Sequence, residues 1–150
     1  MTARTLITTL LLLAFGLAPT FAQAQSPTKI EVLLVMASNS GQGVDAQLKP
    51  YAGNLQRLFR FNTYQLKDRK VLDMTAPGGR NTNLYGGTDL QLGAEAVSDG
   101  KLPINLDWRR GKEKLLRTMV RLNPNTPAIL GGPQDANNTG TYLLIVRWVN

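Results

Sequence analysis

The sequence predicts a mainly β (α+β) fold: an antiparallel β-sandwich-like domain with one amphipathic helix after its first strand. Three observations predict it. Segments between residues 88 and 122 alternate apolar and polar side chains, the period of a strand with one buried face. Asp99-Gly100 separates two of them, and this dipeptide between alternating strands is a strong hairpin signal. Only residues 44–60 show the three- and four-residue apolar spacing of a helix.

The first 24 residues have the layout of a secretory signal peptide. Arg4 precedes a short apolar run, and Ala22-Gln-Ala24 supplies the small residues of a cleavage site. The run is too short and interrupted for a membrane span of about 20 residues, although a retained anchor is the alternative. We therefore expect a signal peptide over residues 1–24, a single β-rich domain over 25–150, and no membrane span after cleavage. The mature domain would be exported, to the periplasm or the cell surface.

Composition excludes several chemistries. Without cysteine, the domain has no disulfides and depends on packing and hydrogen bonds. Without histidine or cysteine, it cannot use a His general base, a Ser-His or Cys-His pair, or a zinc site of His and Cys ligands. With 17 Lys+Arg against 10 Asp+Glu, it is a basic protein of formal net charge +7. This surplus favours anionic partners, and export argues against nucleic acid among them.

The predicted elements begin at residue 29. Residues 29–38 are rich in aliphatic residues and are apolar at both parities from Val32 to Ala37, as in a strand covered on both faces, so we place this strand centrally in its sheet. A loop over 38–43 follows, and Asp45 is the candidate N-cap of a helix over about 44–60. The apolar face of this helix would consist of Leu48, Tyr51, Leu55, Leu58 and Phe59.

The next segments are predicted to be strands joined by turns. Residues 61–74 lead into the turn Ala76-Pro-Gly-Gly79. Turns at Asp99-Gly100 and Gly111-Lys112 then join three strands into a meander. Pro103 has no N–H for the ladder, so we expect it on an edge or facing outward. The buried faces would contain Leu90, Leu92, Ala94 and Ala96, then Leu102, Ile104, Leu106 and Trp108, then Leu116, Thr118, Val120 and Leu122.

A stiff, proline-rich segment precedes the last strand. Asn123-Pro124 and Thr126-Pro127 would end the meander, and residues 128–130 would form a short strand. Gly131-Gly132-Pro133 would terminate that strand at a corner between two packed sheets, with a ligand-holding loop as the alternative. Residues 141–149 are as apolar as the first strand, so we expect the two to pair in the middle of a sheet.

Residues 48–66, a helix that ends in an aromatic cluster, and Ala128-Ile-Leu-Gly-Gly-Pro133 carry a resemblance to known proteins. With the aliphatic first strand before them, they resemble a group of small exported bacterial proteins of unknown function. This resemblance spans most of residues 29–149 and implies a β-rich exported domain with no assigned activity. Thr126-Pro-Ala-Ile-Leu-Gly-Gly132 is also similar to the strand and Gly-Gly turn of outer-membrane secretin channels, although this chain lacks the length for a pore.

The predicted binding surface is basic. Four cationic residues crowd the second hairpin turn, and two more share the following strand face, so neighbouring strands could merge them into one patch. Such a patch would contact an envelope protein or an anionic polymer. A solvated basic face without a partner is the alternative, because Asp107 and Glu113 lie among these residues. The predicted binding residues are Arg109, Arg110, Lys112, Lys114, Arg117 and Arg121.

No catalytic, cofactor or metal residues are predicted. Gly41-Gln-Gly43 lacks the third glycine of a dinucleotide turn, and the aromatic residues match faces expected to be buried rather than a sugar-stacking platform. We expect a non-catalytic exported binding or assembly module of the bacterial cell envelope. One alternative is an accessory subunit of a secretion or pilus system. Another is a carboxylate-dependent hydrolase of an envelope polysaccharide, with acids among Asp89, Glu95, Asp107 and Glu113.

Overall fold

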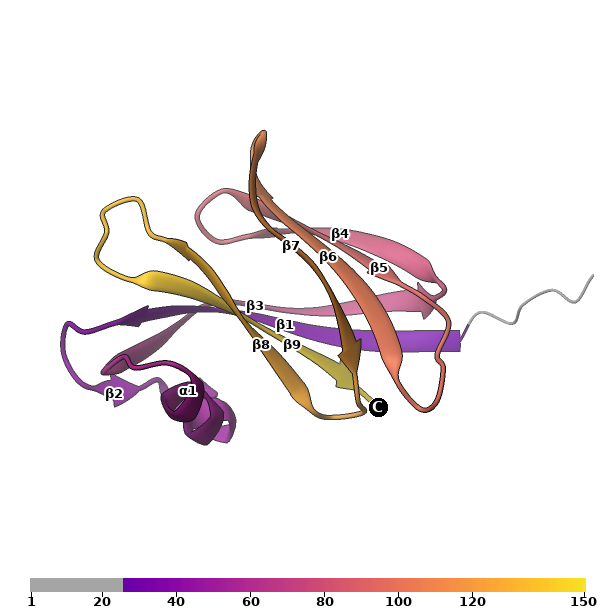
Figure 1. Ribbon diagram of the computed structural model, residues 1–150, viewed down its shortest axis with the longest axis horizontal. Coiled ribbons are helices and arrows are strands. Elements are labelled where there is room, and N and C mark those ends of the chain that lie inside the picture. Colours follow the sequence, from indigo (N-terminus) through magenta and orange to yellow (C-terminus); the bar gives the residue numbers. More distant parts are fainter. Residues whose placement is uncertain (1–25) are drawn as a thin grey trace, which may run out of the picture.

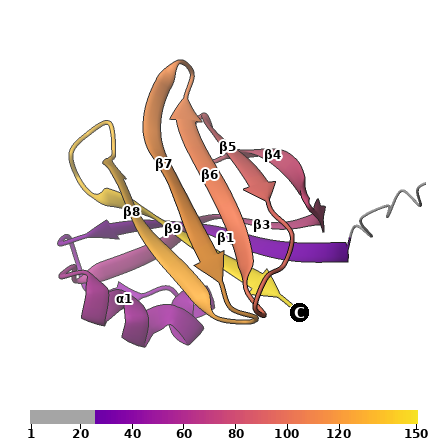
Figure 2. The same ribbon diagram turned by 45° about the vertical axis from the view of Figure 1, so that its right-hand side comes forward.

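A computed structural model describes residues 26–150, and the predicted signal peptide lies outside the described residues. The described part is mainly β, with two sheets packed against each other and one short helix, which confirms the predicted fold class (Figures 1 and 2). One sheet has the order β2-β3-β1-β9-β8, with β1 (Ser26–Ser38), β2 (Gly43–Val44), β3 (Thr63–Ala76), β8 (Pro127–Gln134) and β9 (Thr141–Val149). The other has the order β4-β5-β6-β7, with β4 (Gly78–Leu84), β5 (Thr88–Ala94), β6 (Leu102–Arg110) and β7 (Glu113–Leu122).

The first strand lies inside the five-stranded sheet, as predicted. β1 pairs antiparallel with β3 on one side and with β9 on the other. Ile30, Val32 and Leu34 face the four-stranded sheet and form part of the core between the sheets. Leu33 and Val35 face the opposite way, into a second core under the helix. Because both faces of β1 are covered, its apolar residues do not alternate with polar ones.

The predicted helix is present but shorter, and it begins with a 3-10 turn. η1 (Ala46–Tyr51) runs directly into α1 (Ala52–Leu58). Asp45 caps it as predicted, because its carboxylate accepts a hydrogen bond from Gln47 N at 3.0 Å. Leu48 and Leu55 are buried, whereas the prediction for Leu58 was wrong: this side chain is 55% exposed, at the residue where α1 ends. The helical segment therefore covers the outer face of the five-stranded sheet only near one end (Figure 1).

The predicted meander is confirmed as β5, β6 and β7. Its first turn places Asp99 and Gly100 at φ values of 53° and 69°, the left-handed conformations of a tight hairpin turn. Leu102, Ile104, Leu106 and Trp108 are buried, and each is at most 1% exposed. Ala96 was wrongly assigned to the buried face, because β5 ends at Ala94 and Ala96 is exposed.

Pro103 lies in an inner strand rather than on an edge, and it has the outward parity of β6, which is the other position predicted for it. β6 pairs with β5 on one side and with β7 on the other, and Pro103 is buried. The ladder with β5 ends at the pair Ala94 and Ile104. Next to this pair, the Pro103 carbonyl accepts a hydrogen bond from Glu95 N at 2.9 Å, and the missing N–H of Pro103 is not needed. A proline is therefore tolerated near the beginning of β6, where no ladder N–H is required.

The Gly131-Gly132-Pro133 segment does not terminate a strand, in contrast to the prediction. β8 continues through it to Gln134, with an irregularity between Gly131 and Gln134 in the pairing with β9. Glycine is required at position 132 because a Cβ there would lie 2.3 Å from Cζ3 of Trp108. The passage between the sheets comes earlier, between β7 and β8, where Asn125 has a φ of 58°.

β4 was not expected from the sequence, and it determines the outer face of the four-stranded sheet. The predicted turn after Ala76 takes the chain from β3 in one sheet to β4 in the other. Of the seven β4 residues, only Leu84 is buried. β4 forms the edge beside β5, with Gly79 opposite Gly93. The outer face therefore has four strands, with two glycines side by side.

Candidate binding groove

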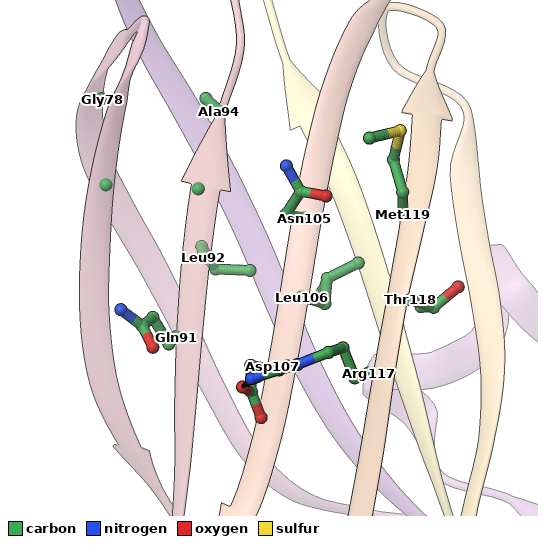
Figure 3. A pocket seen from close by; sticks show the side chains of 12 residues that line it. Gly78, Gln91, Leu92, Ala94, Asn105, Leu106, Asp107, Arg117, Thr118 and Met119 are labelled. Atoms are coloured by element: carbon green, nitrogen blue, oxygen red, sulfur yellow. Dashed lines mark hydrogen bonds and ion pairs between the residues drawn. The ribbon is translucent and has the colours of Figure 1, made fainter.

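A groove of about 720 Å³ crosses the outer face of the four-stranded sheet. All four strands line it, so it runs across the strands rather than along one of them (Figure 3). This face looks away from the core, and its exposed side chains follow the outward parity of β5, β6 and β7. The lining residues used below are Gly79, Gln91, Gly93, Asn105, Asp107, Arg117 and Met119.

Two glycines form the floor of the groove. Gly79 and Gly93 are paired across β4 and β5, and the same row continues through Asn105 on β6 to Met119 on β7. A Cβ at Gly93 would approach nothing closer than Cβ of Asn105, at 3.8 Å, so the space above this residue is open. The hollow thus results from strand register, which brings two residues without side chains together.

Farther along β6, the groove contains a carboxylate shared by two arginines. Arg109 donates from Nε and Nη2 to the two oxygens of Asp107, both at 2.9 Å. Arg117 donates to Oδ2 from Nε at 3.0 Å and also from Nη2 (Figure 3). The hydrogen bonds from Arg109 and Arg117 lower the pKa of Asp107 to about 2. Asp107 is therefore ionised at neutral pH, and two guanidinium charges against one carboxylate leave the cluster with a net charge of +1.

Both guanidinium groups retain donors that a ligand could use. Arginine has five N–H donors. Arg109 and Arg117 each contact Asp107 through Nε and Nη2, and within residues 26–150 their Nη1 groups have no hydrogen-bond partner. The two side chains are 39% and 58% exposed, whereas Asp107 is only 12% exposed. Because the carboxylate already orders both arginines, they lose less conformational entropy on binding, and the cluster suits a carboxylate, sulfate or phosphate group.

The six predicted binding residues do not form one uniform patch. Arg109, Lys114, Arg117 and Arg121 lie on the outer face: Lys114 pairs opposite Arg109, and Arg121 lies farther along β7. Lys112 lies at the tip of the β6–β7 hairpin. Arg110 has the same strand parity as Trp108, so it faces the side of the sheet opposite to the groove. There its charge lowers the pKa of Tyr142, but burial has the larger effect and raises this pKa. Only Arg117 of the six lines the groove.

Carboxylates lie among the basic residues on the outer face of the four-stranded sheet and lower its net positive charge. Asp89 lies opposite Arg109 in the β5–β6 pair, and Glu95 accepts a hydrogen bond from Asn105 Nδ2 at 3.2 Å. The predicted merged basic patch is thus a mixed surface with the Asp107 cluster at its centre. The sequence prediction missed the neutral lining residues. The missed residues are Gly79, Gln91, Gly93, Asn105 and Met119. The alternating pattern placed Gln91, Asn105 and Met119 on the outward face, but Gly79 lay in a predicted turn, and nothing in the pattern marked a hollow.

The carboxylates of the groove give little support to the alternative function, carboxylate-dependent hydrolysis. Of the four candidate acids, Asp107 is the one that lines the groove within the described residues. With a pKa of about 2, Asp107 cannot hold the proton that a glycosidase general acid must donate at neutral pH. The geometry supplies one ionised carboxylate at this position rather than an acid and a base.

A second carboxylate–arginine cluster is buried and joins the helical segment to the sheet. Glu31 on β1, 2% exposed, accepts hydrogen bonds from the Tyr51 hydroxyl at 3.0 Å and from Arg147 Nε at 2.9 Å. Arg69 Nη2 approaches its other oxygen at 2.5 Å. Burial raises the pKa of Glu31, but the hydrogen bonds from Tyr51 and Arg69 and the charges of both arginines outweigh burial and lower it. This carboxylate is inaccessible to a ligand, so we assign it to stability.

Two kinds of feature are not found among residues 26–150: a metal-binding cluster and a membrane-spanning helix. No group of three or more Asp, Glu, His or Cys side chains in this part of the chain could hold a metal ion. None of its helical segments has the length and apolar character needed to traverse a bilayer. In comparisons with protein-family models, curated proteins and solved structures, the chain has no significant match.

Proposed function

We propose that this chain is a non-catalytic, exported binding module of the bacterial cell envelope, and that its groove holds an acidic polysaccharide. The observation that carries this proposal is the cluster of Asp107, Arg109 and Arg117. It presents two ordered guanidinium groups with unused donors beside an open groove. Planar guanidinium groups bind carboxylates and sulfates through paired, charge-assisted hydrogen bonds.

The rest of the groove supports a polymer rather than a small anion. Neighbouring strands lie about 4.8 Å apart, so four strands extend over about 14 Å, which suits several linked sugars. Gln91 and Asn105 can donate to and accept from hydroxyl groups, and Met119, which is 51% exposed, offers an apolar contact for the C–H face of a sugar ring. The glycine floor lets a ligand approach the backbone closely.

Cationic residues around the groove support attraction of a polyanion. Arg121 and Lys114 lie on the same face, and Lys112 lies at the tip of the β6–β7 hairpin. Surface charges of this kind act over about 10 Å at moderate ionic strength and raise association rates. The predicted signal peptide supports the envelope location, since it would deliver the domain to the compartment that contains such polymers.

The test is binding of a polyuronate such as alginate, measured by calorimetry against neutral dextran of similar length. We expect Arg117→Gln to weaken binding about tenfold or more, because it removes charge-assisted hydrogen bonds. Gly93→Val should also weaken binding, because the new side chain would fill the floor of the groove. Affinity should fall as salt concentration rises.

Arg57→Gln is the matched control for the Arg117 variant. It removes the same charge from α1, on the opposite side of the sandwich, where the Arg57 guanidinium donates only to Asn54 Oδ1, at 3.3 Å, among the described residues. We expect this variant to bind alginate like the wild type. If Arg57→Gln and Arg117→Gln weaken binding equally, net charge alone is responsible and the groove is not the site. Release of new reducing ends during the assay would replace the binding proposal by the hydrolase alternative.

Strand pairing with a partner, as in the accessory-subunit alternative, has less support. The edge strand β8 contains two prolines and an irregularity before Gln134. The edge strand β7 carries Arg117 and Arg121 among its exposed residues. Prolines, irregular pairing and charged side chains are features that prevent edge strands from pairing with other chains.

A further inference from the structure

A second cavity, of about 270 Å³, lies at the end of the sandwich that contains the β8–β9 loop. This loop and the end of β1 lie on the left-hand side of Figure 1. The cavity is lined by residues of β1, β3 and β9 and of the loops that connect strands. It shares no lining residue with the groove on the four-stranded sheet. A ligand bound in this cavity would therefore share no contact residue with a ligand bound in the groove.

Strand register builds the base of this cavity. Met36 on β1 pairs with Gln65 on β3 and with Tyr142 on β9, so three neighbouring strands place these side chains in one row. The row continues the β1 face whose earlier residues, such as Leu34, belong to the core between the sheets. At this end, Gln65 joins Met36 and Tyr142 on the same face, so the base combines polar and apolar groups. The base is rigid because it belongs to the centre of the larger sheet.

The walls come from two restrained connections. The β4–β5 turn contributes Tyr85, whose backbone N donates to Asp68 on β3 at 2.9 Å. The β8–β9 loop contributes Asp135 and Thr139, and the Asp135 carboxylate accepts from Thr139 N at 2.6 Å, Thr139 Oγ1 at 2.7 Å and Gly140 N at 2.9 Å. The Asp135 carboxylate thus accepts three hydrogen bonds from donors in its own loop. The walls are ordered before any ligand binds.

Tyr142 has an unused hydroxyl group at this cavity. Its side chain is 8% exposed, and within residues 26–150 its hydroxyl has no hydrogen-bond partner. A Cβ at Gly86 would lie 3.6 Å from the hydroxyl oxygen, so this oxygen lies close to the β4–β5 turn. The other two buried tyrosines do use their hydroxyl groups: Tyr51 donates to Glu31, and Tyr64 donates to backbone carbonyls. Among residues 26–150, the Tyr142 oxygen is not one of the fully buried polar atoms that lack a partner, so the hydroxyl opens into the cavity, where a ligand can reach it.

The remaining lining indicates the chemistry of that ligand. Ser38, Ser40 and Thr139 contribute hydroxyl oxygens that can accept hydrogen bonds from a ligand. The Thr139 hydroxyl already donates to Asp135, and the Ser38 and Ser40 oxygens share one hydrogen bond at 3.1 Å, so one serine donor stays available. Lys67 brings one positive charge, and its Nζ lies 5.9 Å from the centre of the Tyr85 ring. Asp135 brings one negative charge, so the two formal charges balance. A neutral ligand with several hydroxyl groups matches this lining better than an ion of either sign.

We propose that this cavity binds a single neutral sugar unit, with the Tyr142 hydroxyl among its hydrogen-bonding groups. A volume of 270 Å³ equals that of about nine water molecules at about 30 Å³ each, which is enough for a monosaccharide. Met36 and Tyr85 supply apolar contacts for the ring carbons. The site does not depend on the function of the groove, and either proposal can fail without the other.

The test is a nitrogen-15 NMR titration of the full-length protein with glucose, galactose, mannose and N-acetylglucosamine. We expect at least one of these sugars to cause saturable shifts at the amides of Ser38, Tyr85 and Thr139, with a dissociation constant on the order of 1 mM. Tyr142→Phe should weaken binding about fivefold, because one hydrogen bond is lost. The same variant should leave the unfolding midpoint unchanged, because within the described residues this hydroxyl bonds to no protein group.

Tyr64→Phe is the matched control. It removes a hydroxyl that donates to Phe59 O at 2.8 Å and to Leu55 O at 3.2 Å, away from the cavity. We expect reduced stability with unchanged sugar binding. Arg117→Gln should also leave sugar binding unchanged, which separates this site from the groove. The inference is overturned if no sugar gives saturable shifts, if Tyr142→Phe binds like the wild type, or if only zwitterions such as glycine or glutamate bind.

Discussion

Gly132→Ala tests the contact between β8 and the buried tryptophan of the other sheet. The new Cβ would lie 2.3 Å from Cζ3 and 2.9 Å from Cη2 of Trp108, and 2.9 Å from the carbonyl oxygen of Tyr142. Trp108 is 0% exposed, and the Tyr142 carbonyl belongs to β9 inside the larger sheet, so neither can move away freely. Overpacking of a core typically costs about 1–3 kcal/mol. With three close contacts, we expect a loss of about 3 kcal/mol.

The assay is urea unfolding followed by tryptophan fluorescence, with free energies obtained by linear extrapolation. Gly131→Ala is the control, because its Cβ would meet only Cε1 of Phe59, at an ordinary distance of 3.7 Å. An alanine that fits stabilises a protein by about 0.4–1 kcal/mol through its effect on the unfolded chain. The two variants should therefore differ by more than about 3 kcal/mol. Equal stability of the two would refute this explanation of the glycine pair.

Two further predictions concern the carboxylate clusters. Tyr51→Phe should lower the free energy of unfolding by about 1.5 kcal/mol at pH 7, because Glu31 loses a hydrogen bond. The folded-state pKa of Glu31 is lowered, so its stabilisation is present above the usual value of 4.5 and is lost as pH falls through the folded-state value. The cost of Tyr51→Phe should thus shrink as pH falls through the folded-state pKa of Glu31. A cost that stays constant in urea unfolding over a pH series from 7 down to acid unfolding would contradict this. In a carbon-13 NMR titration, the Asp107 carboxyl should change protonation at about pH 2 and, in Arg117→Gln, move toward 3.8. An unchanged midpoint would show that Arg117 does not hold this carboxylate.

The strands that could be predicted from the sequence are those with one face in the core. Along β6, the residues from Leu102 to Trp108 alternate because the pleat turns every second side chain inward. β4 could not be found in this way, because it is an edge strand in which only Leu84 is buried. Glycine is required at position 132 by the proximity of Trp108, a tertiary contact that local turn rules cannot detect.

The candidate site was only partly predictable, for a related reason. The basic residues near the second hairpin were evident, but their arrangement depends on register. Asp107 pairs with Arg117 across β6 and β7, with an irregularity between Trp108 and Arg109 that no local pattern marks. The glycine floor requires β4 and β5 to pair with Gly79 opposite Gly93. Which residues lie opposite each other on neighbouring strands is determined only when the sheet assembles, so these pairs could not be predicted from the sequence.

The position of β1 between β3 and β9 affects how the protein can fold. Lys29 pairs with Val149, so this sheet cannot be completed until the ribosome has synthesised β9. Proteins dominated by such distant pairings fold slowly, because a large loop must close before the contacts form. A nascent chain therefore lacks a complete larger sheet for as long as β9 is missing. That delay suits a polypeptide with the predicted signal peptide, because an unfolded chain can be threaded through a narrow translocation channel and a finished sandwich cannot.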